Sequence, residues 1–293
     1  MPFEAHLFLA LLEGAVSACV LAVTALGLSL VFGVMRVVNV AHGAFFMLGA
    51  VLAWWCAEAI GGPPAAGFAV ALLVAPLGVA AIAIAIDRLI LARIGYGPDA
   101  TIVATIGLVY VLEQATLMTF GPEARSIEPP FYVRIVFPWF GYSGYKLAAA
   151  AVAILLLVAA WFVVTRTRLG LVMRATQFDR ETAQNFGIPV GRVYAAVFAV
   201  GAALAAVAGV LVLPIQQAHY LMGQDPLLLS FIVVTLGGLG SLRGTLVAAL
   251  LIGVSDGVVS VFFSPTVAKI LATLLVALVL VCRPTGLFGA RQP

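Results

Sequence analysis

Long uncharged hydrophobic runs, separated by short charged or Gly/Pro-containing stretches, dominate the sequence. Because about 20 apolar residues of helix cross a bilayer's hydrocarbon core, each run predicts a membrane segment. We place the segments at 14–34, 38–57, 65–86, 100–120, 147–165, 193–213, 226–239, 244–263 and 266–282. The seventh, about 21 Å of helix, is expected to cross obliquely, re-enter, or join its neighbour as one broken element. The pattern therefore predicts an all-α polytopic membrane helical bundle of eight or nine segments, forming a single transmembrane domain over 1–293.

Composition supports this class. The chain is 64% hydrophobic and 9% charged, whereas soluble domains carry roughly 25% charged residues, and its mean hydropathy is +1.19. An ordinary soluble protein is excluded. The formal net charge of +3 is too small to suggest a nucleic-acid partner. We expect the chain to be surrounded by membrane lipid.

The distribution of basic residues predicts the orientation, because Lys and Arg are retained on the cytoplasmic side. With loop 166–192 inside, most of the 15 basic residues lie inside or at the inner boundary. These are Arg36, Arg88, Arg93, Arg166, Arg168, Arg174, Arg180, Arg192, Arg243, Arg283 and Arg291. The aromatic stretch 131–145 then suits an outer interfacial belt. We expect the N-terminus outside and the C-terminus inside.

Residues for enzymatic chemistry are not grouped in this sequence. Neither lysine, Lys146 or Lys269, closes a Gly-Lys-Ser/Thr phosphate loop, and the Gly-rich stretch 237–244 is expected to be a turn between membrane segments. His6, His42 and His219 lie far apart, and Cys19, Cys56 and Cys282 show no metal-ligand spacing. We expect no catalytic residue, metal site or cofactor on this chain, and we interpret the cysteines as packing residues.

Loop 166–192 carries the strongest local signals. Thr176 followed by Asp179 predicts a helix N-terminus with an acidic residue in its first turn. Gly187 and Pro189 predict its end. The expected helix, from about Gln177 to Phe186, is too short to be stable alone in water.

One side of this expected helix is apolar. Phe178, Ala183 and Phe186 recur at helical spacing, whereas Asp179 and Glu181 lie largely elsewhere. Two interpretations remain open: the rings lie back on the inner membrane surface or neighbouring helix ends, or they dock a cytoplasmic partner.

Several polar residues lie where the chain is otherwise apolar. Asn39 and His42 stand at the start of the second segment, and either they line or gate a route, or Asn39 caps the helix while His42 bonds a neighbouring helix. Glu113 is expected in a bundle-facing hydrogen bond or an outer vestibule. Asp256 and Lys269 are expected to pair between segments eight and nine.

Small residues in the sixth segment predict close packing. Gly201, Ala205 and Gly209 follow one another at four-residue spacing, which lets helix backbones approach closely in lipid. A chain this rich in Ala and Gly also produces such spacing by chance.

Three motifs in register carry a resemblance to a known family. Arg174-Ala175, Asp179, Ala183 and Gly187-Ile188 resemble the cytoplasmic loop of ABC-importer permeases, whose short helix sits in a cleft of the ATPase subunit. Asn39-Val40-Ala41-His42-Gly43, after Gly33-Val34-Met35-Arg36, and Gly237-Gly238-Leu239-Gly240-Ser241 look like the LivH-type permease of branched-chain amino acid importers. The similarity covers nearly the whole chain.

That resemblance implies a permease subunit in a bacterial inner membrane. Its implied partners are a second homologous LivM-like permease, two cytoplasmic LivF/LivG-like ATPase subunits that bind ATP and Mg, and a periplasmic or extracellular binding protein. It also implies an ATPase-coupling helix and a translocation path. The coupling residues are Arg174, Ala175, Phe178, Asp179, Glu181, Ala183, Phe186 and Gly187; the path residues are Asn39, His42, Gly43 and Glu113.

The implied activity is alternating-access import of branched-chain or other small amino acids, although related permeases serve urea, amides or small carboxylates. One alternative is a secondary transporter driven by protons or sodium, with Glu113 or Asp256 as the coupling carboxylate. Another is a non-transporting membrane scaffold, for which polar groups at the start of segment two would have no use.

Overall fold

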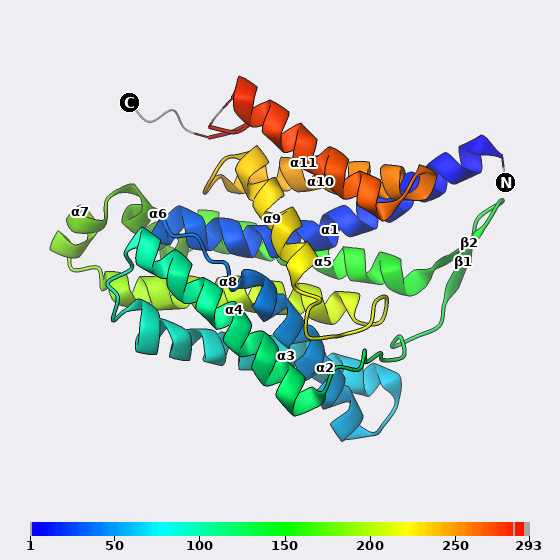
Figure 1. Cartoon of the computed structure of the whole chain (residues 1–293), viewed down its shortest axis with the longest axis horizontal. Coiled ribbons are helices and arrows are strands. Elements are labelled where there is room, and N and C mark those ends of the chain that lie inside the picture. The colour runs from blue at the N-terminus through cyan, green and yellow to red at the C-terminus, as the bar shows by residue number, and fades with distance from the viewer. Residues whose placement is uncertain (1, 284, 290–293) are drawn as a thin grey trace.

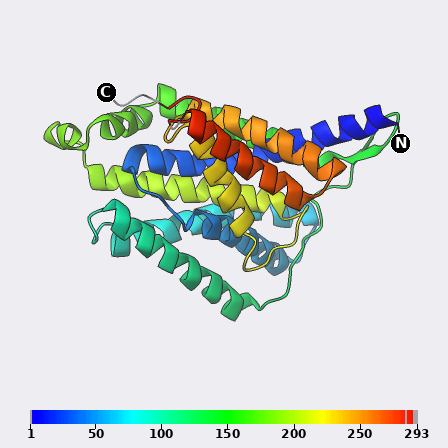
Figure 2. The same ribbon diagram turned by 45° about the horizontal axis from the view of Figure 1, so that its top comes forward.

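The computed structural model describes residues 2–283 and 285–289, which form an elongated bundle of helices aligned broadly along one axis (Figures 1 and 2). Its elements are α1 (Phe3–Met35), α2 (His42–Ile60), α3 (Pro64–Ile86), the π-helical η1 (Asp87–Leu91), α4 (Pro98–Phe120), β1 (Arg134–Val136), β2 (Gly141–Ser143), α5 (Gly144–Arg166), α6 (Arg168–Phe178), α7 (Arg180–Asn185), α8 (Val190–Val212), α9 (Gln224–Gly237), α10 (Leu242–Phe262) and α11 (Pro265–Cys282).

The predicted bundle is confirmed. Over the described residues, eight helices are long and apolar enough to cross a membrane, α3 and η1 counting as one. The short seventh segment is α9, with 14 residues. Boundaries agree most closely where Pro or Gly punctuates the chain, as at Pro64 and Pro98, since proline is favoured in the first turn of a helix.

The two ends of the bundle carry different structures. At one end, β1 and β2 form an antiparallel hairpin in which Arg134 pairs with Ser143, and Phe8 near the start of α1 packs edge-on against Phe137 at 5.4 Å. The sequence pattern predicts an interfacial belt for this aromatic stretch, and it does not predict the two strands. At the other end lie α6 and α7 (Figure 1). We call these the hairpin end and the α6/α7 end.

Helix α1 begins at Phe3, well before the predicted start at residue 14. Its 33 residues extend about 50 Å, more than the roughly 30 Å hydrocarbon core. Glu13 does not end the helix, because its carboxylate accepts a 2.6 Å hydrogen bond from the Lys146 ammonium at the start of α5. The charge that suggested a boundary is therefore compensated by a residue distant in sequence.

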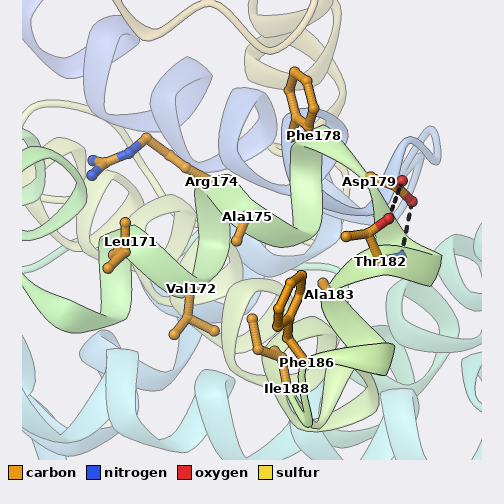
Figure 3. A pocket seen from close by; sticks show the side chains of 10 residues that line it. All are labelled: Leu171, Val172, Arg174, Ala175, Phe178, Asp179, Thr182, Ala183, Phe186 and Ile188. Atoms are coloured by element: carbon orange, nitrogen blue, oxygen red, sulfur yellow. Dashed lines mark hydrogen bonds between the residues drawn. The ribbon is translucent and has the colours of Figure 1, made fainter.

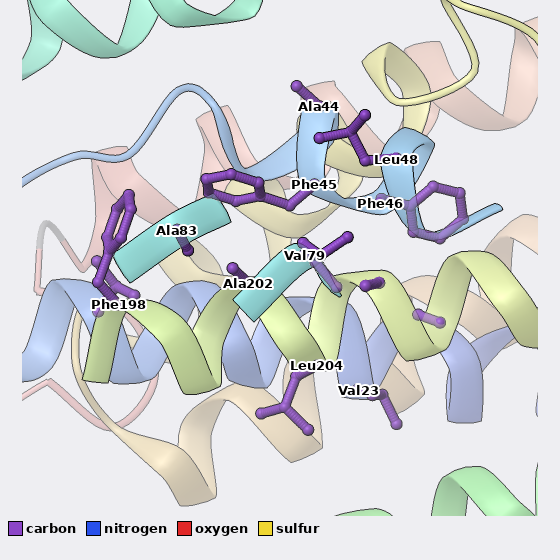
Figure 4. Packing of buried hydrophobic residues seen from close by; sticks show 14 of the residues in the cluster. Val23, Ala44, Phe45, Phe46, Leu48, Val79, Ala83, Phe198, Ala202 and Leu204 are labelled. Atoms are coloured by element: carbon purple, nitrogen blue, oxygen red, sulfur yellow. The ribbon is translucent and has the colours of Figure 1, made fainter. Parts of the chain in front are cut away.

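Close backbone contacts hold the centre of the bundle together. The predicted small-residue face of α8 is confirmed: Gly201 and Gly209 are buried, and a Cβ atom on Gly209 would overlap the Phe46 carbonyl of α2. On the same two helices, Phe45 of α2 meets Phe198 of α8 edge-on at 5.6 Å, with side chains of α3 beside them (Figure 4). Helices α1, α2, α3 and α8 therefore share one core.

Candidate functional site

Between α1 and α2 the chain leaves helical structure, and we call residues 36–41 the α1–α2 break. Arg36 ends α1 in a left-handed conformation with φ of 55°, and helix resumes only at His42. Of the two interpretations of Asn39, the one in which it caps this helix is wrong: Ala41 is the N-cap residue and makes no side-chain cap. Tertiary contacts, rather than a local cap, hold the break in place.

His42 anchors the start of α2 to α1. Its Nε2 lies 2.8 Å from the Thr24 carbonyl oxygen, and because a carbonyl only accepts, Nε2 carries the proton. Thr24 precedes the end of α1 by about 16 Å of helix, roughly half of the hydrocarbon core. Helix α2 therefore starts deep inside the bundle, as Figure 1 also shows.

Polar atoms at this depth have few partners. Asn39 is 1% exposed, and within the described part of the chain neither its amide nitrogen nor its oxygen has a hydrogen-bond partner. The same holds for His42 Nδ1. The next backbone N–H, that of Val40, donates to Thr105 Oγ1 of α4 at 3.2 Å. Burial of unpaired polar groups costs free energy, so these residues are candidates for a functional site.

Gly43 places α9 beside this point. A Cβ atom on Gly43 would meet the Leu227 side chain at 2.8 Å and overlap the Gly223 carbonyl, so glycine is required for the approach of the two helix starts. Helix α9 then runs about 21 Å to Gly237 at the α6/α7 end (Figure 1). Two helices thus begin at the same depth inside the bundle.

The structure does not contain the predicted ion pair between Asp256 and Lys269. Lys269 pairs with Asp225 in the first turn of α9, at 2.6 Å, and not with Asp256. Glu113 lies on α4 with 8% exposure, and among the described residues it makes no ion pair or side-chain hydrogen bond.

Loop 166–192 contains two helices where one was predicted. Helix α6 covers the expected N-cap, and Thr176 instead donates its hydroxyl to the Val172 carbonyl. Asp179 is the true cap of α7, accepting from the backbone N–H groups of Glu181 and Thr182. Hydrogen bonds from the Thr182 hydroxyl and backbone hold the pKa of Asp179 below its usual value. Gly187, with φ of 79°, ends the segment as predicted.

An apolar groove lies between α6 and α7, with a volume of about 590 Å³. Phe178 is 88% and Phe186 83% exposed, and both residues line the groove; the Phe186 ring lies between α6 and α7, whereas the Phe178 ring projects away from it at the end of α6 (Figure 3). We call it the α7 groove; its lining is Leu171, Val172, Arg174, Ala175, Phe178, Asp179, Thr182, Ala183, Phe186 and Ile188. Of the predicted coupling residues, Glu181 and Gly187 are not in this lining. This exposure does not fit the interpretation that both rings lie back on neighbouring helix ends; contact with the inner membrane surface and docking of a partner both stay open.

Three contacts tie α6 and α7 to the membrane helices. Arg174 donates to the Val164 carbonyl of α5. The Arg180 guanidinium lies over the Tyr194 ring of α8, 5.5 Å from its centroid, where cation–π attraction operates. Arg36 Nη2 donates to the Gln177 carbonyl at 3.1 Å. Sequence reasoning missed the role of Arg36, because nothing local indicates a bond across 141 positions.

The profile of one family of membrane transport proteins, described as "Branched-chain amino acid transport system / permease component", matches residues 10–282. The chain belongs to this permease family. Its α1–α2 break, its close contact of Gly43 with α9 and its α7 groove are therefore features of a member of this permease family, and the family resemblance noted in the sequence is confirmed.

Full-length relatives support the assignment. The chain is 27% identical to the high-affinity branched-chain amino acid transport system permease protein BraD of Pseudomonas aeruginosa, over 99% of this chain and 98% of the relative. It is 28% identical to the LivH permease of Escherichia coli K12, covering 92% and 91% of the two chains. It is 24% identical to the probable LivH permease of Methanocaldococcus jannaschii, covering 95% and 92%. No solved structure matches the chain significantly.

Proposed function

We propose that this permease is the membrane subunit of an ATP-driven ABC importer and forms, with a second homologous permease, the path for branched-chain or other small amino acids. The single observation that carries the proposal is the α7 groove. Two phenyl rings that stay exposed at one end of a membrane bundle are suited to insertion into a partner. The partner that fits is a cytoplasmic ATPase subunit, two copies of which bind ATP and Mg.

This assignment sets the orientation. The α6/α7 end faces the cytoplasm, where five arginines of loop 166–192 are favoured. The hairpin end and the start of α1 face outward, toward a binding protein that delivers the substrate. The segment after α11 returns to the cytoplasmic end, since the Leu287 N–H donates to the Leu236 carbonyl at 2.8 Å.

The mechanism that follows is alternating access. When the ATPase subunits close on ATP, the part of the ATPase that occupies the α7 groove moves, and α6 and α7 move with it. Arg174 and Arg180 pass this displacement to α5 and α8, and Arg36 passes it to the end of α1. Arg36 also begins the α1–α2 break, so the same motion shifts Asn39 and His42 beside the buried starts of α2 and α9.

The test replaces both rings, in a Phe178→Ser, Phe186→Ser double variant of the full complex. Burial of each ring is worth about 1.5–3 kcal/mol, so loss of both weakens ATPase binding roughly 100-fold or more. We expect the folded permease to purify without its ATPases and uptake to fall to background. Phe263→Ser, at an exposed ring at the hairpin end, is the matched control. Unchanged assembly and uptake in the double variant would refute the proposal.

The energy source separates this proposal from ion-coupled transport. In cells of the wild type, uptake is expected to continue when ion gradients are collapsed and to stop when ATP is depleted. The reverse pattern would establish a secondary transporter.

A further inference from the structure

A cavity of about 190 Å³ lies between α1, α2, α5, α9 and α10 and the end of α8, and it is partly open because Ser17 and Gln216 of its lining are exposed. On α1 its lining runs from Glu13 to Thr24, about 16 Å of helix. Its inner end is therefore the Thr24 turn, whose carbonyl binds His42. Sites for drug-sized ligands hold roughly 300–1,000 Å³, so this cavity admits only a small solute.

Charges in the lining do not balance. The Lys146 ammonium and the Glu13 carboxylate are 2.6 Å apart and half-buried. Asp256 of α10 lines the same cavity, and among the described residues it makes no ion pair; the nearby Lys269 pairs with Asp225 instead. One carboxylate is thus left over inside a membrane segment, where an uncompensated charge is costly. A ligand that brings an ammonium group supplies the missing partner.

Most of the remaining wall is apolar, with Ser17, Thr24 and Gln216 as its other polar residues. Val16, Val20 and Leu21 of α1 face Leu229 of α9 and Phe46 of α2 around the same space. Such a wall holds an aliphatic chain with release of water. The lining therefore combines a cation, an unpaired anion and an aliphatic surface within one small volume.

We infer that this cavity is a substrate site within the permease for a small aliphatic amino acid in its zwitterionic form. Asp256 accepts hydrogen bonds from the α-ammonium group, Lys146 donates to the α-carboxylate, and the apolar wall holds the side chain. A carboxylate lacking the ammonium would meet two carboxylates with one cation, and a neutral amide would leave Asp256 uncompensated. The inference rests on the proposed function, which supplies the route from this site to the cytoplasm.

The experiment measures two quantities on the complete complex in lipid nanodiscs or liposomes. The first is equilibrium binding of radiolabelled leucine without the binding protein; the second is ATP-driven leucine uptake with it. We expect Asp256→Asn to lower leucine binding at least tenfold and Asp256→Glu to restore part of it. Glu58→Gln, at an exposed carboxylate at the outer end of α2, is the matched control and binds as wild type. Leucine without its amino group, 4-methylpentanoate, does not compete.

The outcomes separate the two claims. Leucine binding by Asp256→Asn equal to wild type, or no binding by wild type at millimolar leucine, overturns the site even where uptake is normal. Leucine binding that depends on Asp256, without ATP-driven uptake, overturns the proposed function and leaves the site standing. If Asp256→Asn does not assemble, Ser17→Phe, which fills the cavity without changing a charge, takes its place: lost binding supports the site and retained binding refutes it.

Discussion

The α7 groove and the α1–α2 break depart from ordinary burial in opposite directions. The groove exposes the rings of Phe178 and Phe186, whereas the break hides Asn39 and His42 at the centre of a membrane bundle. Apolar rings left in water and polar groups left without partners both cost free energy. Departures of this kind are expected at functional positions. The comparison shows that the two regions depend on the rest of the molecule differently, since the two rings of the groove are exposed whereas contacts with neighbouring helices hold the break.

The largest effect is expected from replacing Gly43, the buried glycine beside the α1–α2 break. Gly43→Leu drives a side chain into the Gly223 backbone and Leu227, and backbone overlap cannot be relieved by rotamer change. We expect almost no folded permease, measured as monodisperse protein extracted from membranes. Gly107→Leu on α4, where a Cβ atom meets nothing within 4 Å, should accumulate normally. Normal accumulation of Gly43→Leu would show that the helix starts are not tightly packed.

The next effect concerns the role of His42. His42→Ala removes the bond to the Thr24 carbonyl and leaves a buried gap, at a cost of about 2–5 kcal/mol for a large side chain. We expect a folded complex with uptake reduced about tenfold, measured per complex in liposomes. Normal uptake at unchanged expression would assign His42 a packing role only and would remove it from the pathway.

A smaller effect on uptake is expected when the contact between the α1–α2 break and α6 is removed. Arg36→Gly suits the left-handed backbone at this position and deletes the bond to the Gln177 carbonyl. Because this bond is exposed to solvent, its loss costs about 1 kcal/mol. We expect uptake to fall about fivefold while ATPase binding stays intact. Equal loss of binding and uptake would mean that Arg36 shapes the groove instead of transmitting its motion.

The smallest effect concerns the α7 cap. Asp179→Ala removes the acceptor for two backbone N–H groups and is expected to weaken ATPase binding about twofold, whereas Asp179→Asn, which also caps well, binds nearly as wild type. The folded-state pKa of Asp179 lies below the ordinary value of 3.8. Its contribution is therefore complete above that value and is lost only in more acidic solution. ATPase binding by wild type between pH 8 and 5 should not change through this group; equal binding by the alanine variant would show that the cap is dispensable.

Much of the fold was predictable because the membrane makes demands that a sequence displays directly. Uncharged runs bounded by Pro, Gly or charge gave α3, α4, α5 and α8 nearly in full. The start of α1 was misplaced because the partner of Glu13 is Lys146, 133 positions away. No local rule indicates such a pair.

The candidate site was predicted in its residues and not in its geometry. The polar start of segment two and the aromatic pair of loop 166–192 were visible in the sequence. The extent of the break, which reaches as far as His42, was not, since it depends on Thr24, Thr105 and the approach of Gly223. In the loop, Thr176 and Asp179 are both good caps, and only their surroundings decide that Thr176 stays within α6.

Sided thiol labelling of Phe178→Cys, in a background without Cys19, Cys56 and Cys282, tests the central claim most directly. A membrane-impermeant maleimide is applied to inside-out and right-side-out vesicles, with the ATPase subunits bound or stripped. The account predicts labelling only from the cytoplasmic face and only after the ATPases are removed. Labelling from the outer face, or labelling that bound ATPases do not reduce, would contradict it.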